Sequence, residues 1–418
     1  MTQTHANLDT QSPDVASEEW SAQHSSKLYG VRDWGTDYFD ISADGNAVVS
    51  LQFGEKTIHV PLIDIVNGMK ERGLDMPAVL RIENLLDLRI TQLNEAFARA
   101  IKTAGYKNDY RGVFPIKVNQ QCHVIEEIAD YGRRYHHGLE AGSKAELIIA
   151  ISQLRDHDSL IICNGYKDEE FIELGLYARQ MGIKCFFVLE TATELTTILE
   201  RSKALGIEPL IGMRIRLAST VEGHWNGDSG DRSIFGLSTN ALLEVVEQLK
   251  KADMLHCLQL LHSHLGSQIP NIRSGVMEAC RFYTGLIEEG APMGYMDLGG
   301  GLAVDYEGAR SNSTHSMNYG LDEYCYNIIE TLQECLDPLD IEHPVVITES
   351  GRALIAYSSM LLFNVLEVRD HKPGAIPEMV PDDSPDMLVN LYAVLNNVKL
   401  QNLQECYNDA IYYRDELR

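Results

Sequence analysis

Four separated stretches carry the side chains that could do chemistry in this chain. They are Val113–Gln120, His262–Gln268, Asp297–Gly301 and Glu349–Arg352. Together they supply an amine that could form a Schiff base, an imidazole, a run of three glycines and a carboxylate. Pyridoxal phosphate (PLP) needs these groups to be held in place and to act as an electron sink. The sequence therefore predicts a PLP site assembled from distant parts of the chain.

Lys117 is the candidate for the Schiff-base lysine. It ends the apolar run that begins at Val113, where a strand is expected to meet a loop. One such lysine by itself is more often a solvated strand end, and only the other three stretches favour a catalytic role. An amine becomes a nucleophile when burial or a neighbouring charge lowers its pKa. No other lysine of the sequence lies so clearly at a strand end beside such partners.

The phosphate and the ring of the cofactor also have candidate partners. Gly299–Gly301 directly follows the apolar run Tyr295–Leu298, and glycines either let backbone N–H groups approach a phosphate or simply make a tight turn. Ser267 could add a hydroxyl. His264 could stack on the ring, but His262 lies two residues before it. Residues two apart share one face of a strand, so spacing does not decide which histidine packs in the core.

Glu349 is the most diagnostic residue. A carboxylate at the pyridine nitrogen favours the protonated ring, which is the better electron sink, whereas an arginine there suits racemisation. Glu349 therefore favours decarboxylation. The alternative is a surface ion pair between Glu349 and Arg352. We prefer a phosphate contact for Arg352, because a guanidinium suits planar bidentate contacts.

Two further polar residues end apolar runs. Glu140 could support Lys117 or the ring hydroxyl of the cofactor, and Arg216 could pair with a carboxylate of the site. Neither His262 nor His264 has the carboxylate-rich surroundings that a metal site needs. Metal ligands therefore stay unknown, and a weak Mg²⁺ site stays open.

Short apolar runs alternate with helical patterns from residue 78 onwards. The predicted strands are Val113–Val118, Gly138–Ala141, Ser159–Cys163, Cys185–Leu189, Leu210–Leu217, Leu255–His264, Tyr295–Leu298 and Val345–Glu349. The predicted helices are Cys122–Tyr135, Lys144–Gln153, Glu169–Met181, Glu194–Leu205, Ala241–Lys251, Ile272–Glu289 and Leu321–Leu336. This alternation predicts an α/β fold, a (β/α)8 TIM barrel, with a doubly wound open sheet as the alternative. The candidate residues end different runs, where barrel enzymes place their chemistry.

The flanking segments differ in character. Residues 1–27 are polar and predicted to be a disordered tail. Residues 28–77 predict a hairpin over Tyr29–Leu51 and a lead helix over about Pro61–Arg72. We assign 78–350 to the barrel, and 351–385 to a strand over Met360–Val368 and a linker. That strand is expected to lack partners, which is an aggregation hazard.

The final segment, 386–418, has helical periodicity. The pattern reaches Arg418 without a cap or a terminating Gly or Pro, so we expect the sequence to be incomplete.

Composition limits the classes of partner. Asp plus Glu total 61 against 35 Lys plus Arg, a net charge of -26, which argues against nucleic acid or an anionic membrane and suits a small cationic substrate. The eight cysteines form no C-x-x-C pair, which fits a reducing cytoplasm better than zinc or dithiol chemistry. The sequence shows no apolar run of about 18 residues and no signal peptide.

These residues resemble the fold-type III PLP-dependent decarboxylases, the group of ornithine, diaminopimelate and arginine decarboxylases with an alanine racemase-like barrel. Tyr29–Phe39, Val113–Gln120 and Asp297–Glu307 resemble the biosynthetic arginine decarboxylases within that group. The resemblance covers residues 28–418. It implies that 28–77 and 351–385 are parts of a β-domain, and that the segment from 386 begins an inserted helical bundle.

The resemblance also implies roles by position. Lys117 would be the Schiff-base lysine, His264 the ring-stacking group and Glu349 the partner of the pyridine nitrogen. The phosphate would be held by Ser267, Gly299, Gly300 and Gly301. Gly351 and Arg352 are further candidates for cofactor binding. The stretch near the substrate would be Asp297, Leu298, Gly299, Gly300, Gly301, Leu302, Ala303, Val304, Asp305 and Tyr306. The family further implies Mg²⁺ and a homodimer or higher homo-oligomer with shared active sites.

Two departures from the family pattern stand out. Ser233–Gly236 has Ile234 where the family usually has a lysine, which puts local loop contacts in doubt. The family also completes its site with a C-terminal β-domain that supplies a cysteine motif from the neighbouring subunit, substrate-selecting acids and a tyrosine on the phosphate. None of these is recognisable in the 418 residues.

The reaction implied is decarboxylation of L-arginine to agmatine and CO2, which would feed polyamine biosynthesis. One alternative is a sister decarboxylase of ornithine, lysine, diaminopimelate or carboxynorspermidine. An alternative of another class is a non-catalytic PLP-binding or regulatory protein. A racemase is disfavoured by Glu349.

Overall fold

Buried strands and amphipathic helices alternate through most of this chain. The computed structural model describes residues 20–54, 56–154, 156–217, 235–266, 272–313, 315–369, 377–381 and 383–417. Two compact units can be distinguished, Met1–Phe363 and Asn364–Arg418. Within the described residues, no helix has both the length and the apolar character needed to cross a membrane.

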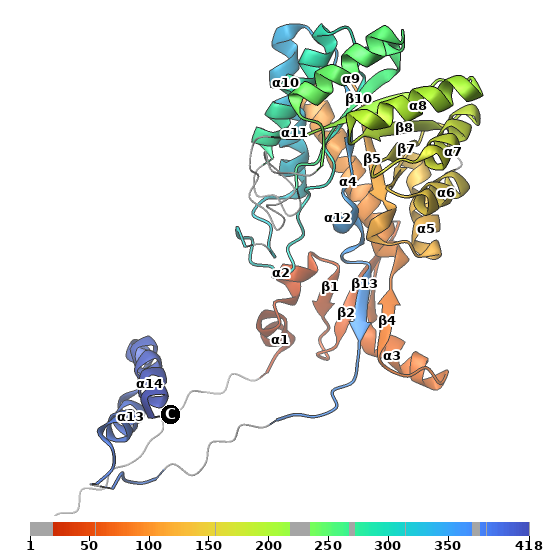
Figure 1. Ribbon diagram of the computed structural model, residues 1–418. Coiled ribbons are helices and arrows are strands. Elements are labelled where there is room, and N and C mark those ends of the chain that lie inside the picture. Colours follow the sequence, from red (N-terminus) through yellow and green to blue (C-terminus); the bar gives the residue numbers. More distant parts are fainter. Residues whose placement is uncertain are drawn as a thin grey trace, which may run out of the picture. The chain divides into compact units, whose positions relative to one another are not determined.

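Eight parallel strands close into a barrel in the order β10-β11-β12-β5-β6-β7-β8-β9 (Figure 1). They are β5 (Tyr110–Pro115), β6 (Gly138–Ala141), β7 (Leu160–Cys163), β8 (Lys184–Leu189), β9 (Leu210–Ile215), β10 (Leu258–Ser263), β11 (Tyr295–Asp297) and β12 (Val345–Thr348). The predicted barrel is confirmed, and ring closure excludes the open sheet. Two of the predicted strands were too long, because three residues of each form a short 3-10 helix instead. These helices are Ile116–Val118 (η1) and Leu255–Cys257 (η3).

Helices cover the outside of the ring (Figure 1). They are α4 (Glu83–Ala104), α5 (Cys122–Gly132), α6 (Lys144–Gln153), α7 (Glu169–Gln180), α8 (Ala192–Leu205), α9 (Thr239–Lys251), α10 (Arg273–Glu288) and α11 (Leu321–Leu336), with short 3-10 turns η2 (Arg133–Tyr135) and η4 (Asp337–Leu339). Ser143, Asp168 and Ser238 cap α6, α7 and α9 by accepting a backbone N–H, which satisfies donors left open at a helix start. α4 is not among the helices predicted from the sequence.

The inside of the barrel has an apolar layer and a polar layer. The apolar layer consists of Val113, Leu160, Ile162, Phe186, Val188, Leu260 and Ile347. Because alternate strand residues share a face, the next inward positions toward the C-terminal end are polar on seven of the eight strands, β5 having Pro115 there. We call them the polar layer: Glu140, Asn164, Glu190, Arg214, His262, Asp297 and Glu349. The apolar layer thus lies on the N-terminal side of the polar layer, whose members are all ionisable except Asn164.

The N-terminal segment forms an antiparallel sheet of β1 (Phe39–Ile41), β2 (Ala47–Phe53) and β3 (Lys56–Pro61). The predicted hairpin is confirmed for β1 and β2, whereas β3 was not foreseen. The prediction was wrong before Phe39, since Val31 and Trp34 lie in α2 (Val31–Gly35) and pack in one apolar cluster with Phe39. The predicted tail contains a helix, α1 (Ala22–Leu28), which Ser21 caps. Residues 1–19 lie outside the described part.

The segments next to the barrel carry four more elements. The lead helix is confirmed as α3 (Leu62–Glu71). The expectation that the strand near Met360 lacks a partner was wrong, because β13 (Ser359–Leu362) pairs antiparallel with β4 (Ala78–Arg81). β13 ends well before the predicted Val368. A short helix, α12 (Gly351–Ile355), lies between β12 and β13.

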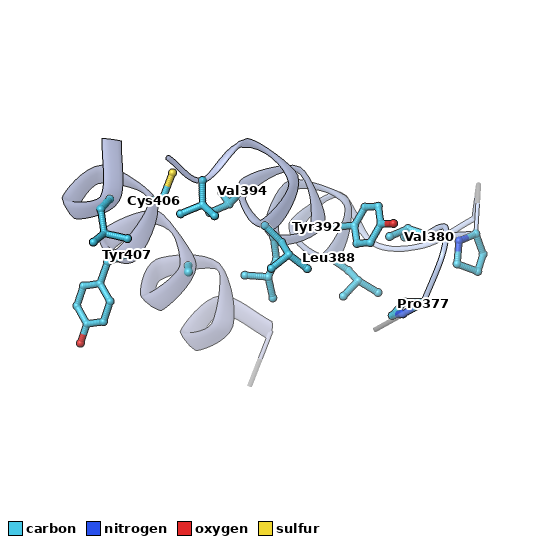
Figure 2. Close-up of a pocket in the computed structure, with 13 residues that line it drawn as sticks. Pro377, Val380, Leu388, Tyr392, Val394, Cys406 and Tyr407 are labelled. Carbon is cyan, nitrogen blue, oxygen red and sulfur yellow. The ribbon is translucent and has the colours of Figure 1, made fainter. Parts of the chain in front are cut away.

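The second unit contains α13 (Asp386–Asn397), η5 (Leu400–Asn402) and α14 (Leu403–Leu417). An apolar cavity of about 580 Å³ lies between these helices. Figure 2 shows side chains that line it, among them Leu388 and Tyr392 on α13 and Cys406 and Tyr407 on α14. No charged side chain of the described residues lines this cavity. The cavity therefore offers little chemistry of its own. Residues 370–376 and 382 of the predicted linker lie outside the described part.

Candidate functional site

Lys117 lies at the C-terminal end of the barrel, in η1 just after β5. Its Nζ is 3.5 Å from Oε2 of Glu140, and its side chain is 59% exposed while that of Glu140 is 1% exposed. Desolvation acts to lower the pKa of Lys117, but the carboxylates of Glu140 and Glu349 outweigh it and the pKa is raised. The amine must therefore give up a proton before it can act as a nucleophile.

Glu140 is the group best placed to exchange that proton. Burial and the nearby charge of Glu349 raise its pKa to about 7, although Lys117 opposes the shift. Neither carboxylate oxygen of Glu140 has a hydrogen-bond partner among the described residues. A carboxyl group with such a pKa can donate or accept a proton near neutral pH.

Glu349 directly follows β12 and is buried, with 5% of its surface exposed. Its Oε1 accepts a hydrogen bond from Nδ2 of Asn164 at 2.8 Å, and Nε2 of His262 lies 3.4 Å from the same oxygen. Burial acts to raise the pKa of Glu349, but His262 and Lys117 outweigh it and the pKa is lowered. The carboxylate stays ionised inside the barrel. The alternative of a surface ion pair with Arg352 is therefore wrong.

The two histidines, which spacing could not distinguish, have different surroundings. His262 lies within β10 and is 1% exposed. Burial acts against its charged form, yet Asp297 and Glu349 raise its pKa, so the expectation that His262 lacks carboxylate neighbours was wrong. His264 lies just beyond β10 and is half-buried, and burial together with Arg214 lowers its pKa to about 3. A neutral ring at His264 is compatible with stacking on a cofactor.

The glycine run forms a tight turn after β11. Gly299 has φ +64° and Gly301 has φ +133°, backbone conformations that favour glycine. A side chain at Gly299 would approach Nδ1 of His264 to 2.9 Å. The N–H of Gly299 donates to Oδ1 of Asp297 at 2.8 Å. Burial and Glu349 raise the pKa of Asp297 to about 7, against the effect of His262.

The predicted substrate stretch continues into a loop that Asp305 organises. Its carboxylate accepts from the backbone N–H groups of Gly308 and Arg310 and from the hydroxyl of Ser316, each at 2.9 Å. Leu302, Ala303 and Val304 are buried and Tyr306 is 48% exposed. Asp305 thus holds the loop in shape. A substrate contact for this stretch stays a prediction.

Several functional positions were missed or lie elsewhere than expected. Arg214 pairs with Glu190 at 2.8 Å, both side chains being largely buried, whereas the guanidinium of the predicted Arg216 donates to the carbonyl of Gly236 at 3.3 Å. The sequence feature that points to Asn164, Glu190 and Arg214 is the two-residue period of side chains along a strand. Each of them lies two positions beyond an inward-facing residue of its strand.

The remaining predicted positions surround the start of α12 or lie outside the described residues. A side chain at Gly351 would meet Cγ of Pro115 at 2.8 Å, so α12 begins in close contact with the end of β5. Arg352 follows and is half-buried. Ser267 and Ile234 lie outside the described residues, and their roles stay predictions.

Comparison with known proteins agrees with this geometry. Residues 90–356 match the pyridoxal binding domain of the pyridoxal-dependent decarboxylases. The chain belongs to this family. Residues 381–418 match the arginine decarboxylase helical bundle domain. Both matches are to decarboxylase domains, and they cover the barrel and the second unit.

Relatives in the decarboxylase family extend over most of this chain. The biosynthetic arginine decarboxylase of Synechococcus sp. (strain RCC307) is 43% identical over 96% of this chain and 63% of its own length. That of Gloeobacter violaceus is 42% identical over 96% of this chain and 62% of its own length. The chain therefore spans less than two thirds of these curated relatives.

Solved structures of the family share the fold. The biosynthetic arginine decarboxylase of Campylobacter jejuni is 31% identical with a TM-score of 0.75, covering 93% of this chain and 64% of that one. Diaminopimelate decarboxylase from M. jannaschii is 22% identical with a TM-score of 0.60, covering 78% of this chain and 69% of that one. The second likeness concerns the fold alone.

The polar layer fits the cofactor of a pyridoxal-dependent decarboxylase. Buried polar atoms without a hydrogen-bond partner among the described residues include both oxygens of Glu140, Oδ1 of Asn164, both ring nitrogens of His262 and Oδ2 of Asp297. Such atoms nearly always find a partner in a protein, in water or in a ligand. The glycine turn lies beside them, and within it Gly300 is half-buried and its N–H makes only a long contact of 3.5 Å with Nδ1 of His264, so this N–H could turn to a phosphate. Lys117 adds the amine that would carry the cofactor.

Proposed function

We propose that this chain provides the PLP-binding barrel of an L-arginine decarboxylase, which forms agmatine and CO2 for polyamine biosynthesis. The observation that carries the proposal is the placement of Lys117, Glu140 and Glu349 together at the C-terminal end of the barrel. Curated relatives that are 43% and 42% identical carry the name biosynthetic arginine decarboxylase. The match to an arginine decarboxylase helical bundle over 381–418 supports the same substrate.

PLP, when bound, would supply the electron sink for the loss of CO2. The residues of the chain would bind and orient it. Lys117 would hold the cofactor covalently, and Glu140 would take up or return a proton at Nζ of Lys117. The ionised Glu349 would face the pyridine nitrogen, and the neutral His264 would cover the ring. The glycine turn after β11 would hold the phosphate through backbone N–H groups beyond Gly299, whose own N–H donates to Asp297.

We also propose the finer features that the family resemblance implies. These are a requirement for Mg²⁺, a cytoplasmic location and a homodimer or higher homo-oligomer with shared sites. Residues 28–77 and 351–385 would belong to a β-domain beside the barrel of 78–350, and 386–418 would begin the helical bundle. Phe39 and Val49 of the first flanking segment pack in one apolar cluster with Met360 of the second, which supports placing both segments in one domain.

The experiment is the release of labelled CO2 from carboxyl-labelled arginine, by protein from the native source with PLP and Mg²⁺ added. Ornithine, lysine and diaminopimelate are run beside it, and the intact mass is checked. We expect release from arginine alone. Release from another amino acid would keep the reaction and change the substrate. No release from any of the four would contradict the decarboxylase proposal and favour a PLP-binding protein without catalysis.

A further inference from the structure

Two residues of the polar layer, Asn164 and His262, contact one and the same oxygen of Glu349. We propose that they are positioning residues, which anchor Oε1 of Glu349 and thereby present Oε2 to the pyridine nitrogen. The inference rests on the proposed function, because it concerns the same cofactor. It assigns a purpose to two side chains that neither bind the phosphate nor form the Schiff base.

Asn164 reaches Glu349 across the inside of the barrel. It follows β7, which is three strands away from β12 around the ring. Its Nδ2 donates to Oε1 of Glu349 at 2.8 Å, and its own backbone N–H donates to the carbonyl of Ala141 at 3.1 Å. Asn164 is only 5% exposed. The donor is therefore fixed by a backbone hydrogen bond and by burial.

His262 approaches Glu349 from the other direction. It lies on β10, with β11 between it and β12, and its Nε2 is 3.4 Å from Oε1 of Glu349. Asp297 on β11 is paired in register with His262. One potential donor or acceptor atom from each of His262, Asp297 and Glu349 lies within 4.8 Å of the other two. His262 is thus placed between two carboxylates.

This arrangement connects both ends of the proposed cofactor site. Asp297 accepts from the N–H of Gly299 and so holds the glycine turn, while Glu349 is held through Oε1. His262 lies between the two. A carboxylate can accept hydrogen bonds on both oxygens. The contacts to Oε1 restrict the rotation of the Glu349 carboxylate, and Oε2 takes no part in these two contacts. Asn164 contributes a hydrogen bond to a charged group, which is stronger than a neutral one, and His262 contributes an ion-pair contact at 3.4 Å, so the loss of either anchor should be measurable.

The test uses PLP labelled with 15N at the ring nitrogen, without substrate. Wild-type protein is compared with Asn164→Ala, Asn164→Leu, His262→Leu and His262→Gln. The readouts are the 15N chemical shift, which reports protonation of the ring, and the dissociation constant of PLP. The leucine at 164 keeps nearly the same shape without a donor. The glutamine at 262 keeps an N–H near the place of Nε2.

Two variants match the burial of these residues away from the polar layer. Asn94 is 7% exposed, and its Nδ2 donates to the carbonyl of Ile90 at 2.8 Å. His137 is 1% exposed and directly precedes β6. Asn94→Ala and His137→Gln therefore control for the loss of a buried polar side chain. Melting temperatures separate a general loss of stability from an effect on Glu349.

We expect a protonated ring in wild type and in both controls. Asn164→Ala, Asn164→Leu and His262→Leu should move the 15N signal towards the unprotonated ring and weaken PLP binding by about tenfold. His262→Gln should recover much of the wild-type signal. A wild-type signal in all variants that carry PLP on Lys117 would overturn the inference and leave the proposed function intact. Wild-type protein that holds no PLP on Lys117 would overturn both.

Discussion

At the scale of single residues, the barrel holds ionisable groups whose pKa values are shifted in opposite directions. The pKa values of Glu140 and Asp297 are raised, whereas the pKa of Glu349 is lowered. Opposite shifts among neighbouring groups divide the roles of proton carrier and fixed charge. In this chain Glu140 suits the first role and Glu349 the second.

Glu349→Gln should leave PLP binding largely intact and reduce turnover by about two orders of magnitude or more. The amide keeps the shape of the side chain but cannot stabilise a protonated pyridine nitrogen through negative charge. The check is kcat with arginine, together with the dissociation constant of PLP. Turnover within a few-fold of wild type would contradict the role of Glu349.

Glu140→Gln should raise the stability of the cofactor-free protein at pH 8. The folded pKa of about 7 lies above the ordinary 4.5, so the folded state binds more protons and stability falls as pH rises from about 4.5 to 7. Removing the charge should gain about 1–3 kcal/mol at pH 8 and little at pH 4. Urea unfolding at the two pH values measures this.

The matched control is Glu190→Gln, for which the opposite sign is expected. Burial acts to raise the pKa of Glu190, but Arg214 outweighs it and the pKa is lowered. The ionised form therefore stabilises the fold above the ordinary pKa, and this contribution is lost as pH falls. Glu190→Gln should be destabilising at pH 8. Equal effects of the two variants would contradict the assigned charges.

Some of these residues could be found in the sequence and others could not. Lys117, Glu140 and Glu349 were identified because each ends an apolar run. Asn164 and Arg214 also lie in period with inward-facing residues, but strands of a parallel barrel are buried on both faces. Hydrophobicity alone therefore does not show which alternate positions face the interior.

At the scale of elements, the glycine turn after β11 shapes the phosphate end of the site. Gly299→Ala should weaken PLP binding by about tenfold or more, since a φ of +64° is strained for alanine and its Cβ would crowd His264. The matched control is Gly285→Ala in α10, where a Cβ would meet nothing within 4 Å. That change should leave binding unaltered and stabilise the helix slightly. PLP titration of both variants checks the prediction, and equal affinities would contradict it.

Elements of the barrel were predicted more accurately than those around it. Buried strands such as β7, Leu160–Cys163, are continuous apolar runs with a polar residue directly after them, which makes their ends recognisable in the sequence. Val31 and Trp34 favour a strand by residue type, but α2 is only a single short helix held by packing on Phe39. Short segments of this kind take their structure from tertiary contacts rather than from propensity. The same applies to β4, which gains its pairing from β13.

At the scale of the whole molecule, closure of the ring brings the site together. Lys117 and Glu349 are distant in the sequence, yet they follow β5 and β12, which are neighbours in the barrel. Closure could be predicted from the alternation of eight strands with helices. Which lysine faces the ionised carboxylates could be confirmed only from the arrangement of the strands.

The central claim is that Lys117 carries PLP, and one other lysine offers a sharp comparison. Lys167 is fully buried, lies 3.5 Å from Glu194 and has a pKa lowered by burial, which is the usual condition for a nucleophilic amine. Its Nζ donates to the carbonyl of Gly165 at 2.7 Å. We expect those contacts to keep Lys167 in a structural role.

The most direct measurement is reduction of the PLP-loaded protein with borohydride, followed by peptide mapping by mass spectrometry. Lys117→Ala and Lys167→Ala are mapped in parallel. We expect the reduced cofactor on the peptide that contains Lys117, its loss in Lys117→Ala and its retention in folded Lys167→Ala. Cofactor fixed at Lys167 or at any other lysine, or retained after Lys117→Ala, would contradict the account.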